Sequence, residues 1–144
     1  MKSNRREIVA NVFDNLNRDN IDSLDQFYHP DVTFIDPASR IEGLTSLKEY
    51  YRNMYQNVLE ISFDYTSFVE QETNLVCIWV MKFRAKGLNS GREVLVHGTS
   101  HLIFDEESNL VKMHRDYFDL GELIYEYIPL LGSLIKKIKS KIGH

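Results

Sequence analysis

Apolar side chains recur at every second position through most of residues 59–118, in stretches separated by short polar links. This alternation is typical of β-strands, because successive side chains of a strand point to opposite faces of a sheet. Links of a few residues join antiparallel neighbours and are too short for a parallel crossover. The pattern therefore predicts an antiparallel meander, with strands at residues 60–71, 75–85, 93–104 and 110–118.

Helical spacing dominates the sequence that precedes this meander. Apolar residues three and four positions apart mark three amphipathic helices. We expect Pro30 to end the second helix, and Thr45 or Ser46 to cap the third. The predicted helices cover residues 8–16, 21–28 and 47–58.

A further strand at residues 32–36 separates the second helix from the third. The order of helices, one strand, a helix, a meander and a tail indicates an α+β fold. In this fold, N-terminal helices cover one face of a curved antiparallel sheet and enclose a pocket. With 144 residues the chain is long enough for one domain with a substantial core, so we predict a single domain over residues 1–144.

Composition narrows the classes of protein that fit. The net charge is −4, and the acidic residues lie before the basic tail, which argues against nucleic-acid binding. Cys77 is the single cysteine, so no internal disulfide can form, and a cytoplasmic location is expected. No apolar run is long enough to span a membrane.

The strand at 75–85 is apolar on both faces, whereas a half-solvated strand would alternate with polar residues. Helices can cover only one of these faces. We expect the other to form a homodimer interface, the alternative being that the tail folds back over it. One face carries Cys77, Trp79, Met81 and Phe83, and the other carries Val76, Ile78 and Val80.

Residues 120–144 predict a basic amphipathic C-terminal helix, interrupted near Pro129 and Gly132. Such a helix can bind an anionic membrane surface, cover the sheet or a partner subunit, or close the pocket. The sequence leaves these alternatives open. The apolar residues of the helix are Ile128, Leu131, Ile135, Ile138 and Ile142, and its lysines are Lys136, Lys137, Lys139 and Lys141.

Three polar residues are candidates for acid–base chemistry. His114 and Asp116 are two positions apart on a predicted strand, so their side chains share a face. A carboxyl group beside an imidazole in an apolar cavity can transfer protons. Asp36 ends the strand at 32–36, where Pro37 fixes its backbone direction, so it too could act as a base. Each residue also has a purely structural alternative. Asp116 could form an ion pair or cap a helix, and His114 could be a buried core residue whose hydrogen bonds are made within the protein. Asp36 could form an Asx turn.

The sequence shows no pattern for other familiar chemistries. It has no phosphate-binding or dinucleotide-binding glycine motif. His97 and His101 share a strand face but lie about 13 Å apart, which is too far for one metal ion. We therefore expect neither a cofactor nor a metal site.

Two segments of the chain resemble a known superfamily. "FYHPDVTFIDPASRIEGLTSLKEYYRNM" (residues 27–54) is similar to the nuclear transport factor 2-like superfamily, and "HRDYFDLGELIYE" (residues 114–126) resembles the end of SnoaL-like proteins and of limonene-epoxide hydrolases. The resemblance implies a cone of curved antiparallel sheet closed by helices around a deep pocket.

The resemblance also implies roles for individual positions. Asp36 matches the general base of ketosteroid isomerases, whose two oxyanion donors would fall at Val12 and Ser100. Asp116 matches an Asp of the epoxide hydrolases, whose Arg and second Asp would fall near Trp79 and Met81. The Tyr and Asn that hold water in those hydrolases would fall at Phe34 and Asp36.

We therefore expect a cofactor-free enzyme of isomerase, cyclase or dehydratase type that acts on an apolar polycyclic, terpenoid or lipid-derived molecule. The alternative is a non-catalytic protein that binds such a ligand, with peripheral membrane contact through its tail. The predicted catalytic residues are Asp36, Asp116 and His114. The predicted ligand-binding residues are Phe34, Trp79, Met81, Ser100, Phe118, Val12 and Tyr51.

Overall fold

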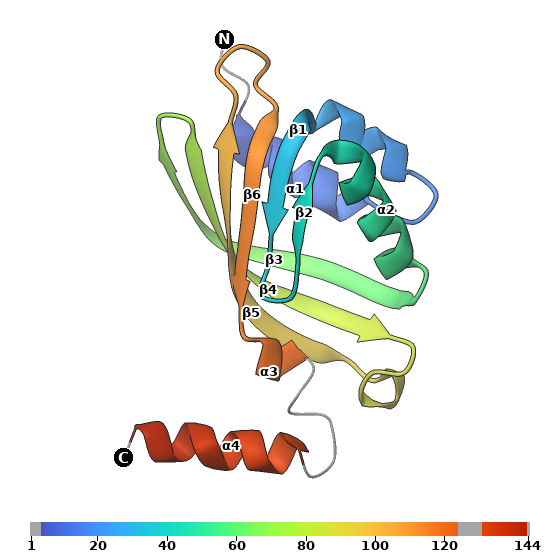
Figure 1. Cartoon of the computed structure of the whole chain (residues 1–144), viewed down its shortest axis with the longest axis vertical. Coiled ribbons are helices and arrows are strands. Elements are labelled where there is room, and N and C mark those ends of the chain that lie inside the picture. Colours follow the sequence, from blue (N-terminus) through green and yellow to red (C-terminus); the bar gives the residue numbers. More distant parts are fainter. Residues whose placement is uncertain (1–3, 124–130, 144) are drawn as a thin grey trace.

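The computed structural model describes residues 4–123 and 131–143. A six-stranded sheet in the order β2-β1-β6-β5-β4-β3 curves around the N-terminal helices, as Figure 1 shows. The strands are β1 (Tyr28–Ile35), β2 (Arg40–Glu42), β3 (Val58–Gln71), β4 (Asn74–Ala85), β5 (Val94–Phe104) and β6 (Val111–Phe118). The helices are α1 (Arg5–Asn15), η1 (Ile21–Gln26), α2 (Leu44–Tyr55), η2 (Asn89–Gly91), α3 (Leu120–Leu123) and α4 (Leu131–Ile142).

The predicted meander is confirmed, because β3, β4, β5 and β6 pair antiparallel in chain order. Register shifts lie between Val58 and Glu60, and between Tyr65 and Ser67. Such irregularities increase the local twist and bend of a strand. The meander therefore curls, and its inner face surrounds a core shared with α1 and α2.

The expectation that the whole sheet is antiparallel is wrong at one position. β1 pairs with β6 in parallel, with Phe34 opposite His114 and Ile35 opposite Arg115. Parallel strands need a long connection, and here the connection consists of α2 and the rest of the meander. This pairing brings the end of β1 beside the end of β6.

Pro30 does not end a helix, contrary to our expectation. The 3₁₀-helix η1 ends at Gln26 and Pro30 lies inside β1. The ladder with β6 shifts register between Tyr28 and Thr33, and β2 pairs only from Thr33 onward. Proline, which has no N–H to donate, is tolerated at such an irregularity.

The predicted cap of α2 is also wrong. The helix begins at Leu44 after Gly43, and no side chain caps it. Gly43 has a φ of +86°, a conformation that residues with a side chain rarely adopt. Its N–H donates to the carbonyl oxygen of Val32, which ties the start of α2 to β1. A tight backbone turn thus replaces the side-chain cap.

The outer face of the sheet is open in the described part of the chain. Its exposed apolar side chains include Val69 on β3, Ile78 on β4, Leu95 on β5 and Tyr117 on β6. α4 lies beyond the end of the sheet, near α3 (Figure 1), and does not cover this face. The alternative in which the tail folds over the sheet is therefore not the arrangement observed.

The tail begins with α3 and continues, after residues 124–130, with α4. The predicted interruption near Pro129 lies outside the described residues, as does Ile128, and Gly132 is the second residue of α4. Lys139 Nζ binds Asp119 Oδ2 at 2.9 Å, which connects α4 to the start of α3. Of the helices described, none has the length and apolar content that crossing a bilayer requires.

Candidate functional site

A cavity of about 130 Å³ lies between the inner face of the sheet and helices α1, α2 and α3. Nine of the ten predicted site residues line it. These are Asp36, Asp116, His114, Phe34, Trp79, Met81, Ser100, Phe118 and Tyr51.

Val12 is the exception. It is half-buried against the core, while Val9 and Phe13 of the same helix line the cavity. Adjacent residues of a helix point in different directions. If the residue expected to line the cavity is counted one position wrong, the side chain at the counted position points away from the cavity. From α1, the apolar side chains of Val9 and Phe13 therefore line the cavity, and Val12 does not.

His114 and Asp116 form a hydrogen-bonded pair, as the two-residue spacing predicted. The Nε2 atom of His114 lies 2.7 Å from Asp116 Oδ1. A carboxylate only accepts hydrogen bonds, so Nε2 carries the hydrogen that joins them. The imidazole is buried, with 3% of its surface exposed, and its ring lies 4.9 Å from that of Phe34 in an edge-to-face contact.

A second donor, itself held by a tryptophan, reaches the same oxygen of Asp116. The hydroxyl of Ser100 donates to Asp116 Oδ1 at 2.5 Å, and Trp79 Nε1 donates to the Ser100 oxygen at 2.9 Å. Ser100 and Asp116 are direct partners across β5 and β6, which explains why they meet. Trp79 thereby fixes the serine hydroxyl, and the serine fixes the carboxylate.

Behind His114 lies a buried pair of tyrosines. The Tyr28 hydroxyl lies 2.7 Å from His114 Nδ1 and 3.0 Å from the Tyr51 hydroxyl. With the hydrogen of a neutral ring on Nε2, Nδ1 accepts from Tyr28, whose oxygen in turn accepts from Tyr51. Burial first of all raises the pKa of both tyrosines well above the usual value, so they remain protonated donors.

The hydrogen bonds from His114 and Ser100 both end at Oδ1 and leave Oδ2 of Asp116 without a partner among the described residues. No buried side-chain oxygen there lacks a hydrogen-bond partner, so Oδ2 must be accessible. Because Asp116 lines the cavity, this oxygen is available to a molecule bound there. The network therefore holds one carboxylate oxygen with two hydrogen bonds and leaves the other free.

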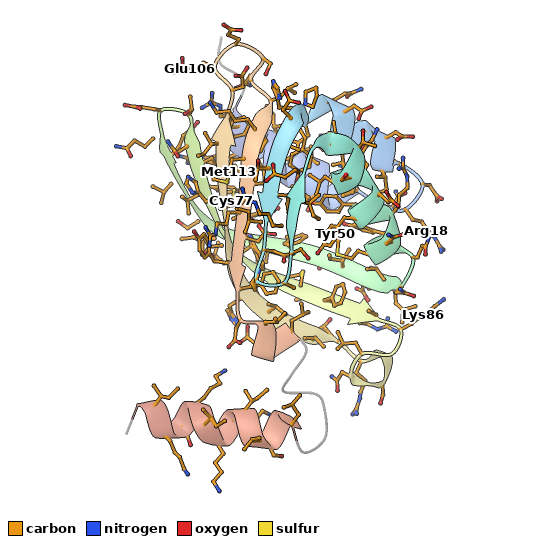
Figure 2. The ribbon with its side chains drawn as sticks, viewed as in Figure 1. Arg18, Tyr50, Cys77, Lys86, Glu106 and Met113 are labelled. Atoms are coloured by element: carbon orange, nitrogen blue, oxygen red, sulfur yellow. The ribbon has the colours of Figure 1, made fainter. Side chains whose placement is uncertain are left out.

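Asp36 is held differently. Its Oδ1 accepts from the backbone N–H of Ala38 at 2.8 Å, which is the Asx turn weighed as an alternative. Its Oδ2 accepts from the hydroxyl of Tyr50 at 2.9 Å; Figure 2 labels Tyr50 on α2. Burial, and then the nearby charge of Asp36, raise the pKa of Tyr50. Because both oxygens of Asp36 have partners, Asp116 is the better placed base.

Sequence reasoning missed three tyrosines that line the cavity: Tyr50, Tyr55 and Tyr65. Tyr55 and Tyr65 make no hydrogen bond through their hydroxyls within the described segments. Burial raises the pKa of Tyr55 to about 12 and raises that of Tyr65 further. The period-two pattern of β3 places Tyr65 on the same face as Phe63 and could have identified it.

Among the described residues that line the cavity there are carboxyl groups but neither lysine nor arginine. Its titratable lining residues are His114, Asp36, Asp116 and tyrosines. Over residues 4–123 and 131–143, no three His, Cys, Asp or Glu side chains come close enough to hold a metal ion. The electrostatics of the site therefore favour an uncharged ligand over an anion.

Similar folds occur among solved structures. A protein from Shewanella denitrificans assigned as a SnoaL-like polyketide cyclase aligns with a TM-score of 0.69 and 19% identity, over 80% of this chain and 90% of that one. An LEH-like epoxide hydrolase from M. tuberculosis aligns with a TM-score of 0.67 and 18% identity, over 94% of each chain. A protein of ketosteroid isomerase-like fold from Catenulispora acidiphila, in complex with trimethylamine, aligns with a TM-score of 0.69 and 14% identity, over 85% of this chain and 91% of that one. At these identities the likeness shows the fold alone.

A sequence comparison identifies the family. No curated protein matches the chain significantly. The family model of the SnoaL-like domain matches residues 9–112, which is most of the chain and ends just before His114. Asp116 and its imidazole partner therefore lie outside the matched segment. The fold agrees with the expected cone of curved sheet and helices, and the chain belongs to the SnoaL-like domain family of the nuclear transport factor 2-like superfamily.

Proposed function

We propose that this protein is an acid–base enzyme of isomerase, cyclase or dehydratase type, acting on a small apolar molecule. The observation that carries the proposal is the free Oδ2 of Asp116, a residue that lines the cavity and whose Oδ1 is held by His114 and Ser100. A positioned carboxylate of this kind accelerates proton transfer by about 10²–10⁴-fold.

In the proposed reaction, Oδ2 takes a proton from a carbon of the substrate, and the electron pair of that C–H bond moves into the substrate. The same carboxyl group then returns the proton at a different carbon, which completes an isomerisation. In a dehydration, the carboxyl group instead gives the proton to a departing hydroxyl group, which leaves as water. In a cyclisation, the carbanion attacks a second carbonyl carbon, and the carboxyl group gives the proton to the alkoxide oxygen that forms. The cavity of about 130 Å³ suits a molecule of about one ring, since an apolar cavity of about 150 Å³ binds benzene.

Hydrogen–deuterium exchange tests this proposal without knowledge of the natural substrate. A panel of small cyclic ketones is incubated with the protein in D₂O, and exchange at the carbon next to the carbonyl is followed by proton NMR. We expect exchange with the wild type, a loss of about 100-fold or more in Asp116→Asn, and a small change in the matched control Asp36→Asn. Equal exchange by wild type and Asp116→Asn rules out Asp116 as the base.

A second candidate function is ligand binding at a membrane surface. Supporting it, α4 lies outside the sheet and exposes apolar side chains along one face, while lysines occupy its remaining surface. A helix of this composition binds anionic bilayers with its apolar face buried at the level of the headgroups. The exposed apolar residues are Leu131, Leu134, Ile138 and Ile142.

We also propose that two copies of this chain associate through the outer face of the sheet. Supporting this, apolar side chains on neighbouring strands are exposed together there, with Ile78 38% and Leu95 45% exposed. Exposed apolar side chains on one sheet face can mark a surface for protein–protein contact. A twofold axis would pair the patch with itself.

A further inference from the structure

α3 forms part of the cavity wall, and its carboxylates fix its position. Leu123 lines the cavity. The carboxylate of Glu122 accepts a hydrogen bond from the backbone N–H of His97 at 2.8 Å, which joins α3 to β5. Asp119 Oδ1 accepts from the backbone N–H groups of Gly121 and Glu122 at 2.8 and 3.2 Å, and so caps the helix. A displacement of α3 would therefore open the cavity on this side.

The other carboxylate oxygen of Asp119 connects α3 to α4. Lys139 Nζ donates to Asp119 Oδ2 at 2.9 Å, and this hydrogen bond lowers the pKa of Asp119. Both side chains are about half-exposed, Lys139 at 49% and Asp119 at 44%. An ion pair between exposed side chains is weak, because water and salt screen it. Another anion that comes close to Lys139 can therefore replace Asp119.

Lys139 lies beside the exposed apolar side of α4. Successive residues of an α-helix are about 100° apart around its axis. One side of α4 therefore carries Gly132, Ile135 and Lys139, and it is the more buried side, with Gly132 buried and Ile135 half-buried. The adjoining side is apolar and exposed, and it consists of Leu131, Leu134, Ile138 and Ile142.

An anionic bilayer fits this exposed side in both polarity and charge. A helix in the bilayer interface buries its apolar side, and the basic side chains at the borders of that side extend to the headgroups. By the same angular spacing, Lys139 and Lys141 lie on the two borders. Residues 130–144 contain four lysines and no acidic residue, so an anionic surface attracts this segment and repels the acidic remainder of the chain.

Such a bilayer competes with Asp119 for Lys139. When the apolar side of α4 enters the headgroup region, Lys139 comes level with the lipid phosphates, which are strong acceptors for an ammonium group. The negative potential of the surface attracts Lys139 and repels the carboxylates of Asp119 and Glu122. Both effects favour separation of α4 from α3.

We propose that binding of α4 to an anionic bilayer opens the cavity, because Lys139 exchanges Asp119 for a lipid phosphate and α3 leaves the cavity wall. The cavity then takes up an apolar molecule that partitions into lipid. Without a bilayer, the ion pair keeps α3 in place and Leu123 in the wall. This inference rests on the second candidate function and names how the membrane regulates the site.

Quenching of Trp79 fluorescence by acrylamide tests the proposal. Trp79 is the single tryptophan, lines the cavity and is 3% exposed, so quenching reports access to the cavity. The Stern–Volmer constant of the full-length protein is measured in buffer, with phosphatidylcholine vesicles, and with saturating vesicles that contain phosphatidylserine. We expect phosphatidylserine to raise the constant about threefold or more, because it increases the population with α3 displaced, and phosphatidylcholine to leave it unchanged.

Two variants break the ion pair without a bilayer. We expect Lys139→Gln to raise the constant in buffer towards the value of the bilayer-bound wild type. Asp119→Asn should do the same, since asparagine still caps α3 but does not hold a lysine. The matched control is Arg52→Gln, which removes the same charge and breaks an exposed ion pair with Asp22 between α2 and η1. It should keep the wild-type constant in buffer and the wild-type rise with vesicles.

Several results would overturn the inference. A wild-type constant in Lys139→Gln does so, as does an equal rise in Arg52→Gln. A constant that rises with protein concentration in buffer identifies a second copy, rather than a bilayer, as the partner of α4. Because unfolding would also expose Trp79, the urea midpoint of each variant is measured, and if it falls, the wild-type vesicle titration decides.

Co-sedimentation separates this inference from the function on which it rests. If the protein co-sediments with phosphatidylserine vesicles and the constant stays unchanged, α4 binds the membrane but does not control access to the cavity. If the protein does not co-sediment, the second candidate function fails and the inference fails with it. The role of Asp116 is tested independently, by deuterium exchange.

Discussion

At the scale of single residues, the site is organised around one oxygen atom, Asp116 Oδ1, on which hydrogen bonds from His114 and Ser100 converge. The pairing of His114 with Asp116 could be predicted, because side chains two apart on a strand share a face. The contributions of Tyr28 and Trp79 could not, because they depend on strand register and on the curvature of the sheet. Tyr28 lies 86 residues before the histidine that it contacts.

Gly98 determines where the indole of Trp79 lies. The two residues face each other across β4 and β5, and a Cβ on Gly98 would overlap the ring of Trp79. In Gly98→Ala the indole must move and give up its hydrogen bond to Ser100. We expect a loss of about 1–3 kcal/mol in the free energy of unfolding, measured in urea, and a shifted emission spectrum of Trp79, which is the single tryptophan.

The control for this prediction is Gly143→Ala, because a Cβ there meets nothing within 4 Å. It should leave both the unfolding curve and the emission spectrum unchanged. Wild-type stability together with wild-type emission in Gly98→Ala would show that the sheet absorbs the methyl group without moving the indole.

At the scale of elements, the strands of the meander and the helices α1 and α2 could be predicted from periodicity alone. The neighbours of β1 could not, because its alternating pattern is compatible with either direction of its partner. Its parallel pairing with β6 is what brings Asp36 to the same end of the sheet as Asp116. The beginning of α2 was predicted wrongly because a backbone turn at Gly43 replaces the polar cap that the sequence offers.

α4 is the element whose partner is still to be tested. We expect the full-length protein to co-sediment with vesicles that contain phosphatidylserine and not with neutral vesicles. Replacing Lys136, Lys137 and Lys141 together by Gln should lower the partition coefficient roughly 100-fold, since each basic residue near an anionic surface contributes about 1 kcal/mol.

A matched control replaces Lys82, Lys86 and Lys112, which are exposed on the body of the protein, by Gln. This variant has the same net charge and should bind vesicles like the wild type. Equal sedimentation of the two triple variants would mean that α4 does not bind the membrane.

At the scale of the whole molecule, the sheet has an apolar inner surface and an outer surface with exposed apolar side chains, and the two differ in what covers them. The inner surface forms the core and the cavity, and the outer one is open in a single chain. The double-sided apolar pattern of the strand at 75–85 predicted both surfaces, because helices cover only one side of a sheet. Which residues would meet across a twofold axis depends on the twist of the sheet and could not be predicted from spacing.

Ile78→Glu tests the proposed dimer. A carboxylate at this position, buried and unpaired in the dimer interface, should raise the dimer dissociation constant by about 100-fold or more, measured by analytical ultracentrifugation. Ser46→Glu, which adds the same charge at an exposed position on α2, should leave it unchanged. A wild-type protein that sediments as a monomer, or an Ile78→Glu variant that dimerises normally, contradicts the proposal.

The parallel pairing of β1 with β6 also has a consequence for synthesis of the chain. Tyr28, made early, can contact His114 only after nearly the entire meander has left the ribosome and folded. Contacts between such distant segments form late, because the loop that joins them must close first. The hydrogen bonds that join Tyr28, His114 and Asp116 therefore form together with the finished fold, and a nascent chain does not contain them.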